Sequence, residues 1–152
     1  MFWRKAKPYP YAVTDWLSRV SRNEWVVTHN TSVNTAVGAV TIPELFETDL
    51  FSAVPDTNHP EFWLASVAHD FMRRSDEWNR VEADIAFGYI MQDAAVTVRE
   101  RLLAGNKSER TANDECIRLM RVASLYLLGV SGLIGSGYIG LGKLHDKLAF
   151  WR

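Results

Sequence analysis

The sequence predicts an α+β fold, in which a small antiparallel sheet packs on about three helices and extended arms lie at both ends. Two patterns predict this class. Before Pro43, β-branched and aromatic residues occur in short runs, as they do in strands. After Pro60, apolar residues recur at the helical period. With 152 residues, of which 47% are hydrophobic, the chain can bury the core of one domain.

The first segment, residues 1–13, is predicted to be an extended arm because Pro8 and Pro10 oppose a helix. The Thr-Asp pair that follows, at 14–15, is typical of a helix N-cap. It predicts a short helix that runs through about Val20.

Two strands are predicted next, at 24–28 and at 36–42, because both segments are rich in β-branched residues. The polar residues 30–34 between them predict a turn. Pro43 ends the second strand, since proline cannot donate a hydrogen bond to a sheet. The expected product is an antiparallel sheet of two or three strands.

Three helices are predicted in the rest of the chain. The first opens with Pro60 in its first turn, where proline is favoured. The second starts within 75–78 and stops at the pair Gly105-Asn106. The third runs from about Thr111 to Leu128. Residues 14–128 are therefore predicted to form a single α+β domain.

The last segment admits two interpretations. Residues 122–142 carry no charge, and this length meets the criterion for a membrane-spanning helix. The segment also contains six of the nine glycines of the chain, and each costs a helix about 1 kcal/mol. The favoured interpretation is that the helix ends before Gly129 and that a glycine-rich tail, residues 129–152, follows. Membrane contact by residues 122–142 is the alternative.

The bulk properties exclude some classes of function. A net charge of −1 gives no reason to expect binding to nucleic acid. Cys116 is the single cysteine, so no disulfide can form within the chain. The basic residues near the N-terminus precede no apolar segment, and no secretory signal peptide is predicted.

The candidate functional residues are His69 and Asp70 in the first helix, Asp49 after the second strand, and Asp84 at the start of the second helix. Neighbouring helical residues point about 100° apart, so only one of His69 and Asp70 can face inward. The two helices are joined by a short connection, which makes convergence of Asp49, Asp84 and the inward residue geometrically reasonable.

Two explanations of this cluster stay open. In the functional one, His69 and the carboxylates act as general acid and base, or His69, Asp49 and Asp84 hold a divalent metal such as zinc that activates water for hydrolysis. In the structural one, Asp84 accepts from Arg80 or Arg73, and His69 bonds to a backbone carbonyl.

These residues resemble a phage and prophage family catalogued as domain of unknown function 1353. The resemblance covers about residues 25–96. The matching positions are Thr48, Asp49, Leu50, Ser52, Val54 and Pro55; Ala65, His69, Asp70, Phe71 and Arg73; and Arg80, Ala83, Asp84 and Phe87. The chain departs from the family pattern by one inserted residue before Pro55 and by Asp56, where a basic residue is common. The resemblance implies a phage or prophage origin and no established activity.

Two functions are therefore predicted. The first is a hydrolase-like phage protein with a His/Asp site that acts on the host envelope during entry or lysis. The second is a non-catalytic virion protein, associated with tail or capsid and held by its aromatic arms to other copies or to other virion proteins. Either would reside in the virion or the host cytoplasm. The arm residues expected to make these contacts are Phe2, Trp3, Tyr9, Tyr11, Phe150 and Trp151.

Overall fold

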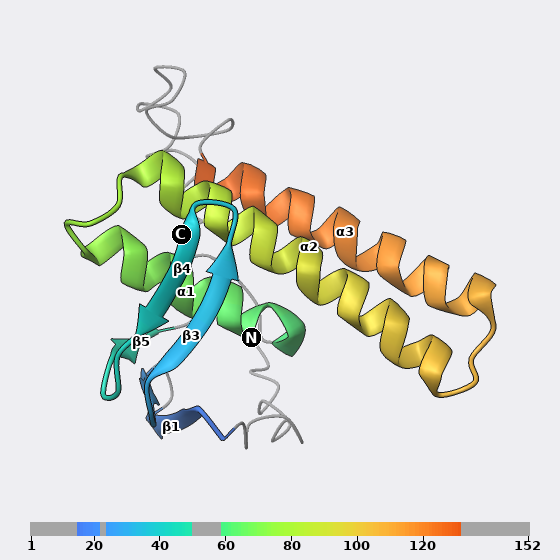
Figure 1. Cartoon of the computed structure of the whole chain (residues 1–152), viewed down its shortest axis with the longest axis horizontal. Coiled ribbons are helices and arrows are strands. Elements are labelled where there is room, and N and C mark those ends of the chain that lie inside the picture. Colours follow the sequence, from blue (N-terminus) through green and yellow to red (C-terminus); the bar gives the residue numbers. More distant parts are fainter. Residues whose placement is uncertain (1–14, 22–23, 50–58, 132–152) are drawn as a thin grey trace, which may run out of the picture.

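The computed structural model describes residues 15–21, 24–49 and 59–131, which form an α+β fold of five strands followed by three long helices (Figure 1). The predicted arm 1–13 and residues 132–152 of the predicted tail lie outside the described residues, and so do the six aromatic residues predicted to make contacts. So does the segment 50–58, which carries Ser52 and Pro55.

The strands form two small antiparallel sheets rather than the single sheet predicted. In the first sheet, β2 (Glu24–Val27) pairs with β1 (Leu17–Ser21) on one side and with β5 (Glu47–Thr48) on the other. The second sheet is a hairpin of β3 (Thr31–Thr35) and β4 (Gly38–Ile42). The β2 side chains alternate between buried and outward positions, as a half-buried strand requires.

Two sequence predictions in this region were wrong. In place of the helix predicted at 14–20, the strand β1 begins at Leu17, because Leu17 pairs with Val27 and is buried there. The predicted turn at 30–34 lies mostly within β3, where Val33 pairs with Val40. Both segments gain their strand conformation from a partner elsewhere in the chain, which local propensity does not record.

The helices fold back on one another. A short 3₁₀ turn, η1 (Pro60–Phe62), leads into α1 (Trp63–Arg74). The chain then returns in α2 (Arg80–Ala104), and α2 and α3 (Glu109–Ser131) lie side by side as an antiparallel hairpin that projects beyond the strands (Figure 1).

The helix starts differ from the predicted ones because capping side chains set them. Asn79 accepts a hydrogen bond from the backbone of Glu82, whose carboxylate accepts from the backbone of Asn79, both at 2.9 Å. This capping box starts α2 after the predicted 75–78. Ser108 similarly accepts from the backbone of Thr111 at 3.1 Å, so α3 begins at Glu109.

The third helix also ends later than predicted. It continues through Gly129 to Ser131, and the carbonyl of Val130 accepts a hydrogen bond from Arg80 at the start of α2. Packing against α2 therefore offsets the helix cost of Gly129. Among the described helices, none is long and apolar enough to cross a membrane, and residues 132–142 of the uncharged segment lie outside them.

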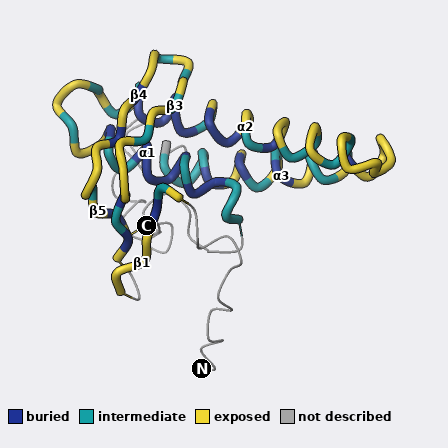
Figure 2. The backbone as a smooth tube through the Cα atoms, turned by 60° about the horizontal axis from the view of Figure 1, so that its bottom comes forward, coloured by how far each residue is buried: buried dark blue, intermediate teal, exposed yellow. Residues whose placement is uncertain are grey.

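The core lies where α1 and the first half of α2 meet the strands. Figure 2 shows buried residues concentrated there, whereas the far end of the α2–α3 hairpin is exposed. The β3–β4 hairpin packs over α1 and α2 (Figure 1). The largest side chains with almost no exposed surface include Phe62, Phe87, Met72 and Met91. Of the predicted site residues, His69 of α1 and Asp84 of α2 thus belong to the most buried part of the molecule.

Candidate functional site

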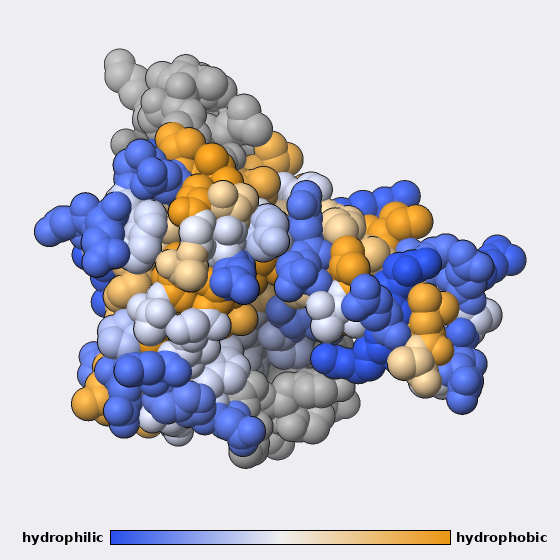
Figure 3. Space-filling view, viewed as in Figure 1, coloured by the Kyte–Doolittle hydropathy of each residue, from blue (hydrophilic) through white to orange (hydrophobic). Residues whose placement is uncertain are grey.

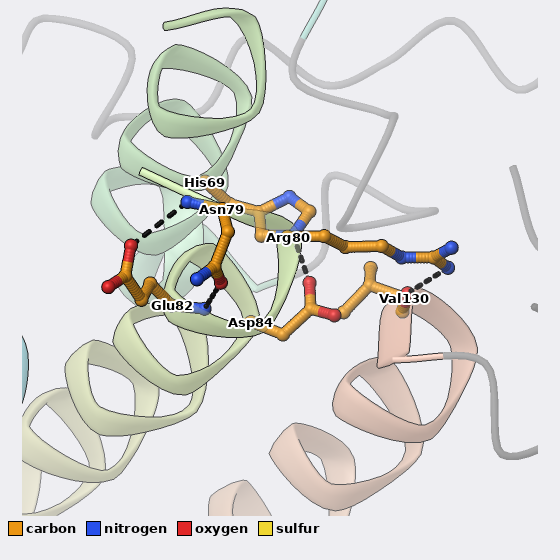
Figure 4. A network of polar contacts seen from close by, with 6 residues as sticks. All are labelled: His69, Asn79, Arg80, Glu82, Asp84 and Val130. Atoms are coloured by element: carbon orange, nitrogen blue, oxygen red, sulfur yellow. Dashed lines mark hydrogen bonds and ion pairs between the residues drawn. The ribbon is translucent and has the colours of Figure 1, made fainter. Parts of the chain in front are cut away.

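His69 and Asp84 meet inside the core. The Nε2 atom of His69 in α1 lies 2.6 Å from Oδ1 of Asp84 in α2. Both side chains are only 6% exposed. Figure 4 shows the imidazole and the carboxylate facing each other across the two helices. We call these two residues the His69–Asp84 pair.

The apolar faces of both helices bring the two residues together. In α1, His69 lies four residues after Ala65 and three before Met72, both fully buried. In α2, Asp84 lies three residues before Phe87, which is also fully buried. Residues at these spacings share one helix face. Each polar residue is therefore part of an inward stripe, and each stripe packs on the other.

An aromatic ring completes the surroundings of the imidazole. The rings of His69 and Phe87 lie with their centroids 5.1 Å apart and their planes at 48°. The imidazole thus has an apolar neighbour on the helix that also supplies its carboxylate. A buried polar group in such surroundings needs a hydrogen-bond partner, and the two residues supply this to one another.

The contact bears on which ring nitrogen carries the proton. An ionised carboxylate can only accept hydrogen bonds, so its contact with His69 requires the tautomer in which Nε2 carries the proton. In the neutral ring, Nδ1 then holds the free lone pair. Figure 4 shows this second nitrogen turned away from Asp84. A nitrogen with this lone pair can take up a proton or bind a cation.

The start of α2 is held firmly around the pair. The capping box at Asn79 fixes where α2 begins, and this sets the direction in which Asp84 points. Arg80, in the same turn, donates from Nη2 to the carbonyl of Val130 at 3.5 Å (Figure 4). All three helices therefore meet near the pair. His69 comes from α1 and Asp84 from α2, and α3 accepts the hydrogen bond from Arg80.

Asp70 faces a different part of the molecule, as its position next to an inward His69 requires. Its carboxylate accepts from Nη2 of Arg74 at 2.8 Å, one helical turn later. Arg74 also donates to the backbone carbonyl of Glu47 and covers the ring of Phe46 at 4.3 Å. Asp70 thus anchors α1 to the edge strand β5 through Arg74 and does not join the His69–Asp84 pair.

Asp49 is exposed and follows directly after β5. Among the residues that the structure describes, no three His, Cys, Asp or Glu side chains form a group that could hold a metal ion. Asp49 therefore does not join His69 and Asp84 as a third ligand, and the predicted zinc site of these three residues is not assembled in the described part of the chain.

Sequence reasoning missed two features of this site. It gave His69 a backbone carbonyl as its structural partner, whereas the partner is the carboxylate of Asp84. It also overlooked Asn79, although an Asn followed three residues later by Glu82 before an apolar stripe is the sequence signature of a capping box. That signature would have given the start of α2 and hence the register of Asp84.

Comparison with known proteins finds one family. The model described as "Protein of unknown function (DUF1353)" matches residues 25–104, just over half of the chain. The match includes α1, α2 and both residues of the His69–Asp84 pair. No curated protein and no solved structure matches the chain.

Proposed function

We propose that this chain, which belongs to the DUF1353 family of unknown function, is a phage-encoded hydrolase in which His69 acts as general base and Asp84 orients it. The observation that carries the proposal is the 2.6 Å contact between Nε2 and the buried carboxylate, together with the free Nδ1 on the far side of the ring. The phage origin and the host envelope as target are inferred from the family resemblance alone.

The proposed chemistry follows from the protonation of the pair. Asp84 accepts a hydrogen bond from the Nε2–H group of His69 and so keeps the lone pair of the ring on Nδ1. Nδ1 then removes a proton from water as the water attacks an amide or phosphate bond. The carboxylate stabilises the imidazolium that forms, and Nδ1 returns the proton to the leaving group. Low exposure strengthens this electrostatic stabilisation because bulk water is largely excluded.

Activity on isolated cell envelopes tests the proposal. Full-length protein is incubated with purified peptidoglycan and, separately, with a phosphodiester substrate, and release of amino groups or of acid groups is measured. Asp84→Asn keeps the size of the side chain and an oxygen that can accept from His69, so the fold should persist. We expect it to lower the rate at least about tenfold, because the imidazolium loses its counter-charge. Asp76→Asn, an exposed residue outside the site, is the matched control.

Two outcomes would refute the hydrolase. One is an absence of activity on both substrates in protein that is fully folded by circular dichroism. The other is activity that Asp84→Asn and Asp76→Asn lower equally, because general-base catalysis by His69 predicts a loss in the first variant alone.

A non-catalytic virion protein is the second candidate, and a specific observation favours it. Val81, Ile85 and Tyr89 recur every four residues along α2 and are 49%, 46% and 43% exposed. Figure 3 shows hydrophobic residues gathered over the first turns of α2 and the last turns of α3. Exposed apolar stripes of this kind are found where proteins meet partners. In this candidate the His69–Asp84 pair only joins α1 to α2.

Solution size and particle association test this second role. The virion role predicts that full-length protein sediments as an oligomer or co-purifies with phage particles, and that Ile85→Lys weakens this association. Ile117→Lys places the same charge on a similarly exposed residue of α3, outside the α2 stripe, and is the control. A monomer that is absent from particles would contradict the virion role.

A further inference from the structure

A groove separate from the His69–Asp84 pair lies between α2, η1, the start of α1 and the strand β3. Its volume is about 500 Å³, within the range of sites that bind small ligands. Apolar side chains of α1 and α2 form most of its surface, among them Leu64, Ile90, Ala94 and Val98. Neither His69 nor Asp84 lines it, so the proposed hydrolase site does not use this space.

Along the wall formed by α2, an acidic and a basic side chain lie at different positions. Asp93, Thr97 and Arg101 recur every four residues of α2 and therefore lie in one row beside the groove. Asp93 and Arg101 are eight residues apart, or about 12 Å along the helix axis. Within the described part of the chain, neither of these two side chains forms an ion pair. The groove thus has an acidic end and a basic end.

The groove has a second carboxylate, and one of its oxygen atoms lacks a hydrogen-bond donor. Glu61 of η1 also lines the groove, and its Oε2 atom is buried without a hydrogen-bond partner among the described residues. A buried acceptor left in this state costs free energy until a donor reaches it. Together with Asp93, Glu61 favours a cationic group with several N–H donors, such as an ammonium.

We propose that this groove binds a short apolar peptide, with its amino terminus at Glu61 and Asp93 and its carboxyl terminus at Arg101. An extended peptide of about four residues spans roughly 13–14 Å, which matches the separation of the two charged ends. Its side chains would contact the apolar surface formed by Ile90, Ala94 and Val98. The order of charges along α2 fixes the direction of the peptide.

Calorimetric titration of the full-length protein with the tetrapeptide Ala-Leu-Leu-Ala tests the proposal. We expect saturable binding with one peptide per chain. Acetylation of the amino terminus should weaken binding about two- to fivefold in the wild type, as expected for loss of an exposed ion pair. It should have little further effect in Asp93→Asn. Amidation of the carboxyl terminus should weaken binding similarly, with little further effect in Arg101→Gln.

Matched controls remove an exposed charge outside the groove. Asp76→Asn and Arg110→Gln should bind all three peptides as the wild type does. An absence of saturable binding at millimolar peptide would overturn the proposal. So would equal losses on acetylation in the wild type and in Asp93→Asn, because the amino terminus would then not lie at the acidic end. Since binding is measured without turnover, the result is independent of the proposed hydrolase.

Discussion

Removal of Asp84 should destabilise the fold by a predictable amount. Asp84→Ala takes away the acceptor for Nε2 of His69, whose side chain is only 6% exposed. A buried donor left without a partner costs about 1–3 kcal/mol. For a chain of this length, each kcal/mol lowers the melting temperature by about 2–4 °C. The variant should therefore melt roughly 2–12 °C below the wild type.

A double-mutant cycle isolates the pair from the cavities that the substitutions leave. His69→Ala, Asp84→Ala and the double variant are each unfolded in urea, and the free energies of unfolding are compared with that of the wild type. We expect a coupling energy of about 1–3 kcal/mol, because the double variant has lost both members of one interaction. A coupling energy below about 0.5 kcal/mol would show that the contact contributes nothing specific and would refute this reasoning.

Two further variants give reference values for the loss of stability in Asp84→Ala. Asp84→Asn retains an oxygen that accepts from Nε2 and should therefore lose less stability than Asp84→Ala. Asp70→Ala breaks the neighbouring ion pair with Arg74, whose side chain is 52% exposed. Such pairs contribute about 0.2–1 kcal/mol, so this variant should be the mildest of the alanine substitutions.

Substitutions at three other positions test the architecture, each by urea unfolding of the full-length protein. Asn79→Ala removes the N-cap of α2 and should cost about 1 kcal/mol; an unchanged stability would contradict the capping box. Gly88 approaches α3 so closely that an added Cβ would lie 3.1 Å from the Leu127 side chain. Gly88→Leu should cost about 1–3 kcal/mol, whereas Gly88→Ala should stay within about 1 kcal/mol; the reverse order would contradict this packing. The hydrogen bond from Arg118 lowers the pKa of Glu115 in the folded protein. The stabilising effect of this bond is therefore present above the unfolded pKa of Glu115, about 4.3. It is lost as the pH falls through the lower pKa of the folded protein. Glu115→Gln should accordingly cost about 0.2–0.5 kcal/mol at neutral pH and nothing in acid; a difference that persists in acid would contradict the ion pair.

The elements that could be predicted from the sequence are those that local patterns specify. The apolar period gave all three helices, and the stop signal at Gly105 is correct because α2 ends one residue before it. The left-handed residue that follows the helix is Asn106, with φ of 61°, rather than the glycine. Asparagine tolerates this conformation through its short polar side chain, so the stop signal is shared by the two residues.

The elements that were missed depend on partners distant in the sequence. The residues of β3 are mostly polar, and nothing in that segment alone favours a strand. Their conformation comes from β4, where Val40 faces Val33 and where the hydroxyl groups of Ser32 and Thr41 lie 2.9 Å apart. A five-residue segment cannot encode such cross-strand pairs by itself. The same reason explains why the capping signal before β1 was misleading, since pairing with β2 overrides it.

The candidate site lies between these two cases. Helical spacing allows only one of His69 and Asp70 to face inward. The structure gives this position to His69, and Asp70 pairs with Arg74 one turn later. The same spacing places Asp84 among the apolar residues of α2 that precede Phe87. A short connection makes α2 return along α1, so the two inward stripes must pack together (Figure 1). Two polar groups on such stripes need partners, and a proton donor that faces a carboxylate satisfies both at once. The pair is therefore a consequence of patterns present in the sequence. The direction in which Nδ1 of His69 faces depends on the tertiary packing around the ring.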